Sequence, residues 1–148
     1  MLNDEPEPRC EELPSVLSQW TVSLLSRVAE RMRESFESRV SHLGLRSKHY
    51  AVLLLLRDGA RTQAEIGRQT RVDRSTMVAL IDELEALGLV ERARHAEDRR
   101  AHAVTLTDKG HRAEREASQA VDATEAECFA PLSAPEREQL RALLSKLL

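Results

Sequence analysis

The sequence predicts a mainly α-helical fold (α+β), with six helices and one small antiparallel hairpin. Gly and Pro number only five each among 148 residues, which favours long helices over a many-turned β fold. Apolar residues recur close to every fourth position over long stretches, whereas only 89–107 alternates as strands do. Because aromatic residues make up 3% and apolar residues 41%, we expect an aliphatic core.

Charge is unevenly distributed along the chain. The net charge is −3, but residues 14–113 carry 17 bases and 13 acids, whereas the segments on either side are acidic. This asymmetry is compatible with a nucleic-acid-binding face between acidic ends, and equally with an ordinary solvated surface. Residues 1–13 hold five acids and two prolines with little to bury, so we expect a disordered acidic tail.

Several classes of protein are disfavoured by what the sequence contains. Two cysteines, Cys10 and Cys128, are too few for a disulfide scaffold. We find no signal peptide and no apolar run long enough to cross a membrane, so we expect a cytoplasmic protein. There is no nucleophile elbow, phosphate loop or pair of catalytic carboxylates, so we expect neither an enzyme nor a cofactor.

Two long amphipathic helices are predicted, one near each end of the chain. The first covers 14–42, and its apolar stripe comprises Leu17, Trp20, Leu24, Val28, Met32, Phe36 and Val40. At that length, unless the segment folds back on itself, the stripe must pack against something outside a compact domain. An apolar helix follows between Ser47 and Gly59.

The second long helix is predicted over 108–130, capped by Thr107 and ended by Pro131. It is rich in alanine, which suits close helix packing. A Ser-x-x-Glu capping box at 133–136 begins the last helix. We expect that helix to bury Leu140, Leu143, Leu144 and Leu147.

Residues 61–70 and 74–88 are predicted to form two helices joined by a short turn, a helix-turn-helix arrangement. Ala64 and Gly67 would let the helices cross closely. The residues expected to bury the joint are Ile66, Val72, Leu80, Ile81 and Leu84.

The second of these helices begins with Asp73 as N-cap, followed by Arg74, Ser75 and Thr76. An arginine and short hydroxyls at a helix N-terminus suit the major groove of DNA, so we predict that Arg74, Ser75 and Thr76 contact it. The competing interpretation is that Asp73, Ser75 and Thr76 only cap the helix.

A hairpin follows, with strands at 89–95 and 101–107 and a charged tip at 96–100. Arg99 and Arg100 at the tip can enter the minor groove, and Asp98 would brace them. Arg94, at the end of the first strand, is included among the predicted DNA contacts. A charged turn alone is also explained by solvation, but a helix-turn-helix followed by this hairpin is far more specific.

Residues 14–148 resemble the MarR family of bacterial transcription regulators. The family's Asp-x-Arg motif matches Asp98 and Arg100, its Leu-Thr-x-x-Gly matches 106–110, and its Leu-x-x-x-Gly-Leu-x-x-Arg matches 84–92. The resemblance implies a winged helix-turn-helix with a two- or three-stranded wing, within an intertwined helical homodimer. It implies repression from a near-palindromic double-stranded operator, with release by small ligands or oxidants, and it favours Arg100 as the deeper wing arginine.

The implied organisation has three parts: the tail 1–13, a helical dimerisation region formed by 14–60 and 108–148, and a winged DNA-binding domain, 61–107. One departure from the family pattern is Ala79, where many relatives carry Arg or Pro. The helix that contains it is also acidic in its C-terminal half, so we expect base contacts to crowd into its first turn.

The resemblance places a ligand cleft where the dimer helices meet the winged domain. An aromatic or phenolic effector could be lined by Trp20, His49 and Tyr50, and its carboxylate could pair with Arg27 or Arg46. Ordinary core packing competes with this role for Trp20 and Tyr50.

Three alternatives remain open from the sequence. Cys10 and Cys128 could make the chain a redox-sensing repressor, although the acids beside Cys10 disfavour a thiolate. The histidines lack the close spacing of metal ligands, so no metal is expected. The one alternative is a metal held by the pair His42 and His111. The chain could also be a winged-helix protein-interaction module that does not bind DNA.

Overall fold

The computed structural model describes residues 14–94 and 102–148. Its elements in chain order are α1 (Ser15–Ser18), α2 (Thr21–Val40), the 3-10 helix η1 (Ser41–Leu43), α3 (Ser47–Leu56), β1 (Arg61–Thr62), α4 (Gln63–Thr70), α5 (Arg74–Ala86), β2 (Val90–Arg94), β3 (His102–Leu106), α6 (Asp108–Cys128) and α7 (Ala134–Ser145). The predicted fold class is confirmed: the chain is mostly helical with one small antiparallel sheet.

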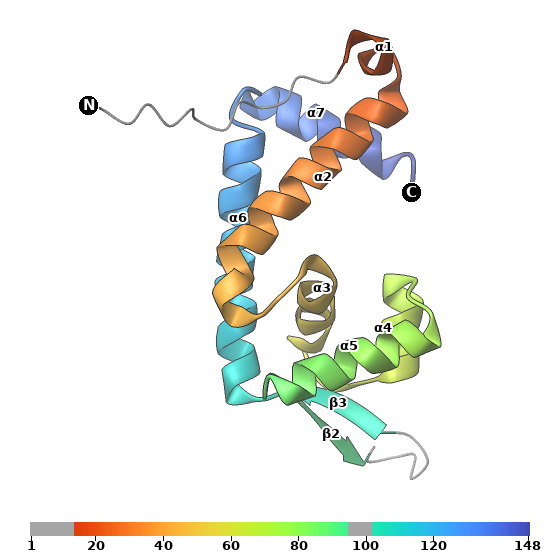
Figure 1. Ribbon diagram of the computed structural model, residues 1–148, viewed down its shortest axis with the longest axis vertical. Coiled ribbons are helices and arrows are strands. Elements are labelled where there is room, and N and C mark those ends of the chain that lie inside the picture. Colours follow the sequence, from red (N-terminus) through yellow and green to blue (C-terminus); the bar gives the residue numbers. More distant parts are fainter. Residues whose placement is uncertain (1–13, 95–101) are drawn as a thin grey trace, which may run out of the picture.

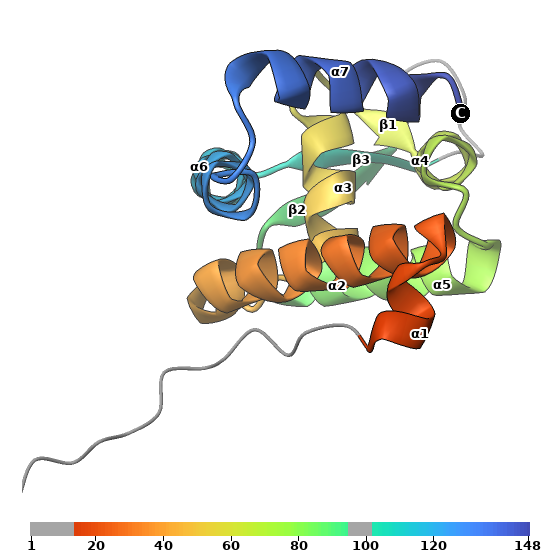
Figure 2. The same cartoon turned by 90° about the horizontal axis from the view of Figure 1, so that it is seen from above.

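The elements separate into two regions along α6 (Figure 1). At one end α2 crosses α6, with α1 and α7 beyond it, and we call α1, α2 and α7 the helical arm. At the other end lie the elements from α3 to β3, residues 47–106, which we call the winged body. Figure 2, seen from above, shows α2 and α7 on opposite sides of the view, with α6 at one edge and α3 visible in the gap between them because it lies farther down.

The core is mostly aliphatic, as the composition predicts, and is centred on the winged body, with Phe36 and Val40 of α2 and Ala113 and Ala117 of α6 packed into it. Val52, Leu53 and Leu56 of α3 are almost wholly buried, together with Ile81 of α5 and Val104 of β3. Helix α3 therefore lies at the centre of the body, although the sequence division places it with the dimerisation region.

The predicted single helix over 14–42 is wrong at one point, so the described residues contain seven α-helices instead of six. Trp20 adopts an extended conformation (φ −105°, ψ 123°) as the N-cap of α2 and separates α2 from α1. Before it, the side chains of Ser18 and Gln19 donate hydrogen bonds to Ser15 O and Val16 O. Such local bonds compete with helix continuation, and apolar periodicity does not register them.

The predicted burial of the last helix is also wrong within one chain. None of the residues of α7 is buried, and Leu143 and Leu147 are 51% and 76% exposed. The capping box that begins the helix is present, since Glu136 Oε2 accepts hydrogen bonds from Ser133 N–H and Oγ–H at 2.8 and 2.7 Å. Local sequence therefore predicted where α7 starts but not what covers its apolar face.

The wing is a three-stranded antiparallel sheet in the order β1-β3-β2. The central strand β3 pairs Val104 with Arg61 on one side and Arg92 on the other. The two-residue strand β1 was included in a predicted helix at 61–70, because two residues are too few to show alternation.

Candidate nucleic-acid interface

Helices α4 and α5 and the turn between them form the centre of the candidate interface. Thr62 Oγ1 accepts a hydrogen bond from Glu65 N–H (3.2 Å), and Glu65 Oε2 accepts one from Thr62 N–H (2.7 Å), which fixes the start of α4. A β-carbon at Gly67 would lie 3.2 Å from Val72 O, so a small residue lets the turn fold back closely. The expected joint is confirmed: Val72 is half-buried, and the buried members are Ile66, Leu80, Ile81 and Leu84.

The first turn of α5 is organised around Asp73. Its Oδ1 accepts hydrogen bonds from Ser75 Oγ–H (2.6 Å) and Thr76 N–H (3.0 Å), and its Oδ2 accepts one from Thr76 Oγ1–H (2.6 Å). These hydrogen bonds, led by that from Ser75, hold the pKa of the Asp73 carboxyl well below its usual range. The N-cap role predicted for Asp73 is confirmed, and the two hydroxyls direct their protons to this carboxylate.

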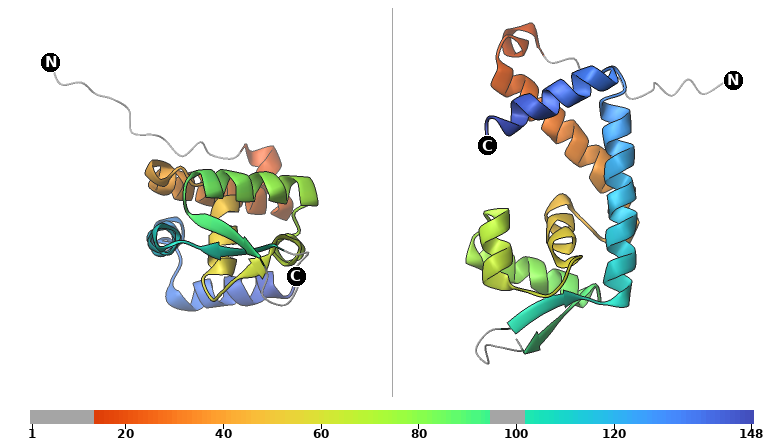
Figure 3. Two further views of the ribbon diagram at one scale, coloured as in Figure 1. Left: turned by 90° about the horizontal axis from the view of Figure 1, so that it is seen from below. Right: turned by 180° about the vertical axis from the view of Figure 1, so that it is seen from behind.

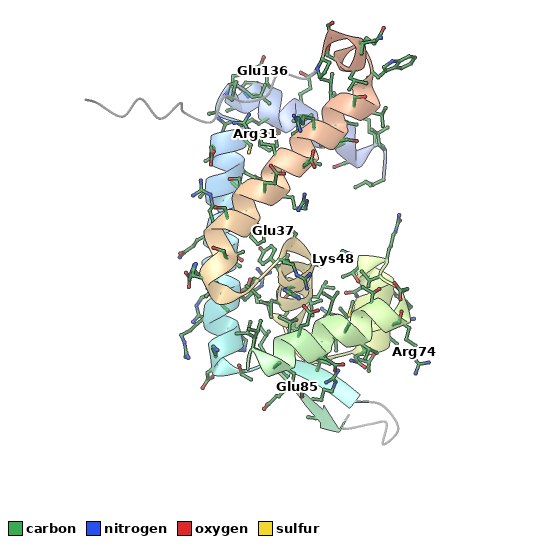
Figure 4. All side chains as sticks on the ribbon, in the orientation of Figure 1. Arg31, Glu37, Lys48, Arg74, Glu85 and Glu136 are labelled. Atoms are coloured by element: carbon green, nitrogen blue, oxygen red, sulfur yellow. The ribbon has the colours of Figure 1, made fainter. Side chains whose placement is uncertain are left out.

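A groove of about 870 Å³ lies between α4 and α5 and continues to the turn between them. Arg68, Arg71 and Arg74 line it, and all three are exposed. The guanidinium groups of these three arginines make no hydrogen bond or ion pair with any residue that the structure describes. Figure 4 shows Arg74 pointing away from the winged body at the start of α5. Arg68 and Arg71 were not singled out by sequence reasoning; their three-residue spacing before Arg74 was the available signal.

The acids in the C-terminal half of α5 are engaged by other elements. Arg92 of β2 pairs with Asp82 (2.5 Å) and with Glu85. Glu83 pairs with Arg46 and with His49 Nε2 (2.8 Å). All three acids of this half are therefore held in ion pairs, and two arginines offset most of their negative charge. The groove retains the positive charge of its arginines.

The wing extends toward the same side of the molecule as the N-terminus of α5. Figure 1 and the rear view in Figure 3 agree on this arrangement. In β2, Arg94 pairs in register with His102 of β3. The predicted tip residues Asp98, Arg99 and Arg100 lie outside the described residues, so their roles stay predictions.

The Leu-Thr-x-x-Gly motif joins the winged body to α6. Thr107 Oγ1 accepts a hydrogen bond from Gly110 N–H (3.0 Å) and donates one to Gly88 O (2.7 Å). A β-carbon at Gly110 would lie 1.9 Å from Leu89 O, so only glycine allows this contact. The motif thus fixes the direction in which α6 leaves the body.

The predicted effector residues fall into two groups. His49 is buried, its Nδ1 accepts Arg46 N–H (3.2 Å), and both residues contact Glu83. Tyr50 lies on the same helix and shares a hydrogen bond with Ser118 Oγ (3.1 Å).

Trp20 and Arg27 lie on the helical arm, away from the group on α3 (Figure 1). Trp20 is 61% exposed, and Arg27 forms an ion pair with Glu30, with 3.5 Å between Nη1 and Oε2. One chain therefore does not bring Trp20 and Arg27 together with Arg46, His49 and Tyr50.

The remaining candidates stay untested as sites. Cys128 is a free, half-buried thiol, and Cys10 lies outside the described residues. His42 Nε2 lies 2.6 Å from Glu116 Oε1, and His111 is on α6. Among residues 14–94 and 102–148, no cluster of three or more His, Cys, Asp or Glu side chains suits a metal ion. No described helix is long and apolar enough to cross a membrane.

Comparison with known proteins places the chain in a family. A model of the MarR family matches residues 43–101. The transcriptional repressor CouR from Rhodococcus jostii RHA1, solved with a 23-mer DNA duplex, is 32% identical, with a TM-score of 0.82 over 90% of this chain and 95% of that one. CouR has also been solved bound to p-coumaroyl-CoA.

Two further structures are similar over most of their length. A MarR-family regulator from Rhodococcus sp. RHA1 is 30% identical, with a TM-score of 0.79 over 88% of this chain and 94% of that one. A probable transcriptional regulator from Pseudomonas aeruginosa is 28% identical, with a TM-score of 0.81 over 89% and 99%. The fold and site are those of a winged helix-turn-helix transcription regulator. The chain belongs to the MarR family.

Proposed function

We propose that the chain acts as a homodimeric repressor that binds a near-palindromic, double-stranded operator. Helix α5 of each protomer would enter the major groove, and Arg99 and Arg100 of each wing would reach the minor groove. The observation that carries this proposal is the charge state of the α4–α5 surface. Its acids are engaged by neighbouring side chains, while the guanidinium groups of Arg68, Arg71 and Arg74 have no partner in the part of the chain that the structure describes and could pair with phosphates or bases.

The helical arm supports a dimer. Trp20, Leu24 and Val28 are 61%, 45% and 46% exposed, and Leu143 and Leu144 of α7 are also exposed. Apolar surface of this extent on neighbouring helices is typical of a protein–protein interface. A two-fold dimer would place two α5 helices about one DNA turn apart.

The chemistry of the first turn limits what Ser75 and Thr76 can read. Because both hydroxyl protons are donated to Asp73, their oxygens remain available chiefly as acceptors. They suit the exocyclic amino groups of adenine or cytosine better than a phosphate, which needs a donor. Arg74 would supply the donors that guanine or phosphate requires.

For the effector we propose an aromatic compound, of the class that the related CouR binds as p-coumaroyl-CoA. Arg46 and His49 support this, because both contact Glu83 of α5. A ligand carboxylate or phosphate that pairs with Arg46 would break the Arg46–Glu83 ion pair, which links the start of α3 to α5. Trp20 and Arg27 would contribute if the arm of one protomer reaches the body of the other.

The proposal is tested by selecting a binding site from random duplexes and titrating the protein by fluorescence anisotropy. Replacing Arg100 with Ala should weaken binding by tens-fold without changing dimer mass. Unchanged affinity would overturn the wing's role. Loss of binding to every duplex, at all salt concentrations, would favour the protein-interaction module instead.

A thermal-shift screen with aromatic acids, their coenzyme A thioesters and peroxide would separate ligand control from redox control through Cys10 and Cys128. Stabilisation by an aromatic compound, with release of the operator, is the expected result. Release by peroxide alone would support the redox alternative. As a regulator of transcription, the protein would act in the cytoplasm, where the bacterial chromosome lies.

A further inference from the structure

The turn between α4 and α5 contains an unusual backbone conformation. Arg71 has φ 54° and ψ 33°, in the left-handed region, and it is the only non-glycine residue with positive φ among residues 14–94 and 102–148. Glycine adopts this conformation without steric cost, whereas a side chain with a β-carbon does not. A glycine at this position would suit the backbone of the turn better than an arginine.

The backbone function of this turn does not use the arginine side chain. The N–H groups of residues 71 and 72 both donate to Gly67 O, which closes the C-terminus of α4. Glycine would make both of these hydrogen bonds. The unfavourable backbone conformation therefore needs an explanation in what the guanidinium does.

Among residues 14–94 and 102–148 the guanidinium of Arg71 has no hydrogen-bond or ion-pair partner. Its side chain is exposed and lines the α4–α5 groove together with Arg68 and Arg74. The nearest acid in sequence, Asp73, already accepts hydrogen bonds from Ser75 and Thr76. No side-chain hydrogen bond or ion pair in the described residues offsets the cost of placing arginine at this turn.

We propose that Arg71 is a DNA-contacting residue that binds a backbone phosphate at the edge of the major groove. Arg68, one helical turn earlier on the same groove, would bind a neighbouring phosphate. This inference rests on the proposed function, because it assumes that α5 enters the major groove. Guanidinium groups pair with phosphate through two parallel hydrogen bonds, so Arg71 would fix the register of α5 without reading bases.

The test uses two substitutions that relieve the backbone and remove the charge, Arg71→Gly and Arg71→Asn. Both should leave the melting temperature unchanged or raise it by a few degrees, since both residues tolerate the left-handed region. Both should nevertheless weaken operator binding. Because each phosphate contact contributes about 0.9 to the slope of log K against log salt, a dimer should lose about two units of slope.

Two controls separate charge from backbone. Arg71→Lys keeps a positive charge and the strained turn, so most of the salt slope should remain. Arg115→Ala removes an exposed arginine from α6, away from the α4–α5 groove, and should leave the slope unchanged. A weaker binder that is as stable as or more stable than the wild type is the expected signature of Arg71→Gly.

The outcomes distinguish this inference from the proposed function. If the wild type binds its operator and Arg74→Ala weakens it, but Arg71→Gly leaves affinity and slope unchanged, the role of Arg71 is overturned and the proposed function stands. If Arg71→Gly lowers the melting temperature, the arginine serves the fold and the inference is also overturned. If the wild type binds no duplex, the proposed function itself fails.

Discussion

In the winged body, Leu53, Ile81 and Val104 have no exposed surface, whereas Trp20, Leu24 and Val28 of the helical arm are about half exposed. The two regions have similar apolar patterning in the sequence. The difference is that helices and a sheet surround α3 within one chain, while the stripe on the N-terminal half of α2 faces outward and only its last members, Phe36 and Val40, are buried. The comparison teaches that a single chain completes the winged body but leaves the apolar side chains at the N-terminal half of α2 exposed.

The largest expected effect comes from charging the arm. Replacing both Leu24 and Val28 with Asp should prevent dimerisation, because association would bury two carboxylates per chain without partners. Operator affinity should fall by about 100-fold or more, since two linked recognition helices gain avidity of that order. Sedimentation velocity would report the mass, and anisotropy the affinity.

The matched control places a carboxylate on the opposite face of α2. Ser26 is exposed and lies about half a turn away from both Leu24 and Val28 around the helix. Ser26→Asp should leave mass and affinity unchanged. A Leu24→Asp, Val28→Asp protein that remains dimeric would show that the arm's stripe is not the interface.

Much of the winged body could be predicted because its helix ends are set by residues close together in the sequence. The caps at Asp73 and Thr107 and the stop at Gly88 involve residues at most a few positions apart. The buried residues of α4 and α5 recur with the spacing of a helix, and this spacing can be recognised in the sequence of one chain alone. The family motifs then indicated the wing between these helices and α6.

Other features depend on distances that sequence does not contain. The pairing of Arg92 with Asp82 and Glu85 requires β2 to lie beside α5. The exposure of α7 depends on where the helix lies relative to the winged body, which its own capping and spacing do not specify. The break at Trp20 depends on side-chain hydrogen bonds, which apolar periodicity does not register. The positive φ of Arg71 was likewise invisible, because arginine at a turn gives no signal for the left-handed region.

A second, smaller effect concerns how the stability of the fold depends on pH through the hydrogen bond between His49 of α3 and Glu83 of α5. Burial lowers the pKa of His49 from its ordinary value of 6.5, although the hydrogen bond to Glu83 opposes this shift. Its Nδ1 accepts Arg46 N–H, so the neutral ring donates through Nε2 to Glu83 and has no place for a second proton. The unfolded chain takes up that proton near pH 6.5, and the folded chain does so only at lower pH.

Stability should therefore fall as pH drops below about 6.5, by at most about 1.4 kcal/mol per pH unit. The Arg46 hydrogen bond lowers the pKa of Glu83, so its own contribution is lost only as pH falls below its ordinary value of 4.5. Urea unfolding of His49→Gln should show a shallower loss between pH 6.5 and 5.5 and run parallel to the wild type above pH 7.5. Equal slopes in both ranges would contradict this account of His49.

The smallest effect concerns Val78, the one large apolar side chain that is exposed in the described residues 47–94 and 102–106. Its exposure is like that of the apolar side chains on the helical arm. Val78 lies on α5 one turn after Arg74, beside Ser75. If α5 enters the major groove, the methyl groups of Val78 can contact the C5-methyl of a thymine.

Replacing that thymine with uracil should weaken wild-type binding by about fourfold, the equivalent of one buried methyl group at about 0.8 kcal/mol. Val78→Ala should lose this sensitivity in anisotropy titrations, whereas Val78→Thr, which retains one methyl, should keep part of it. Equal sensitivity in the wild type and Val78→Ala would mean that Val78 does not face the bases and that its exposure belongs to another contact.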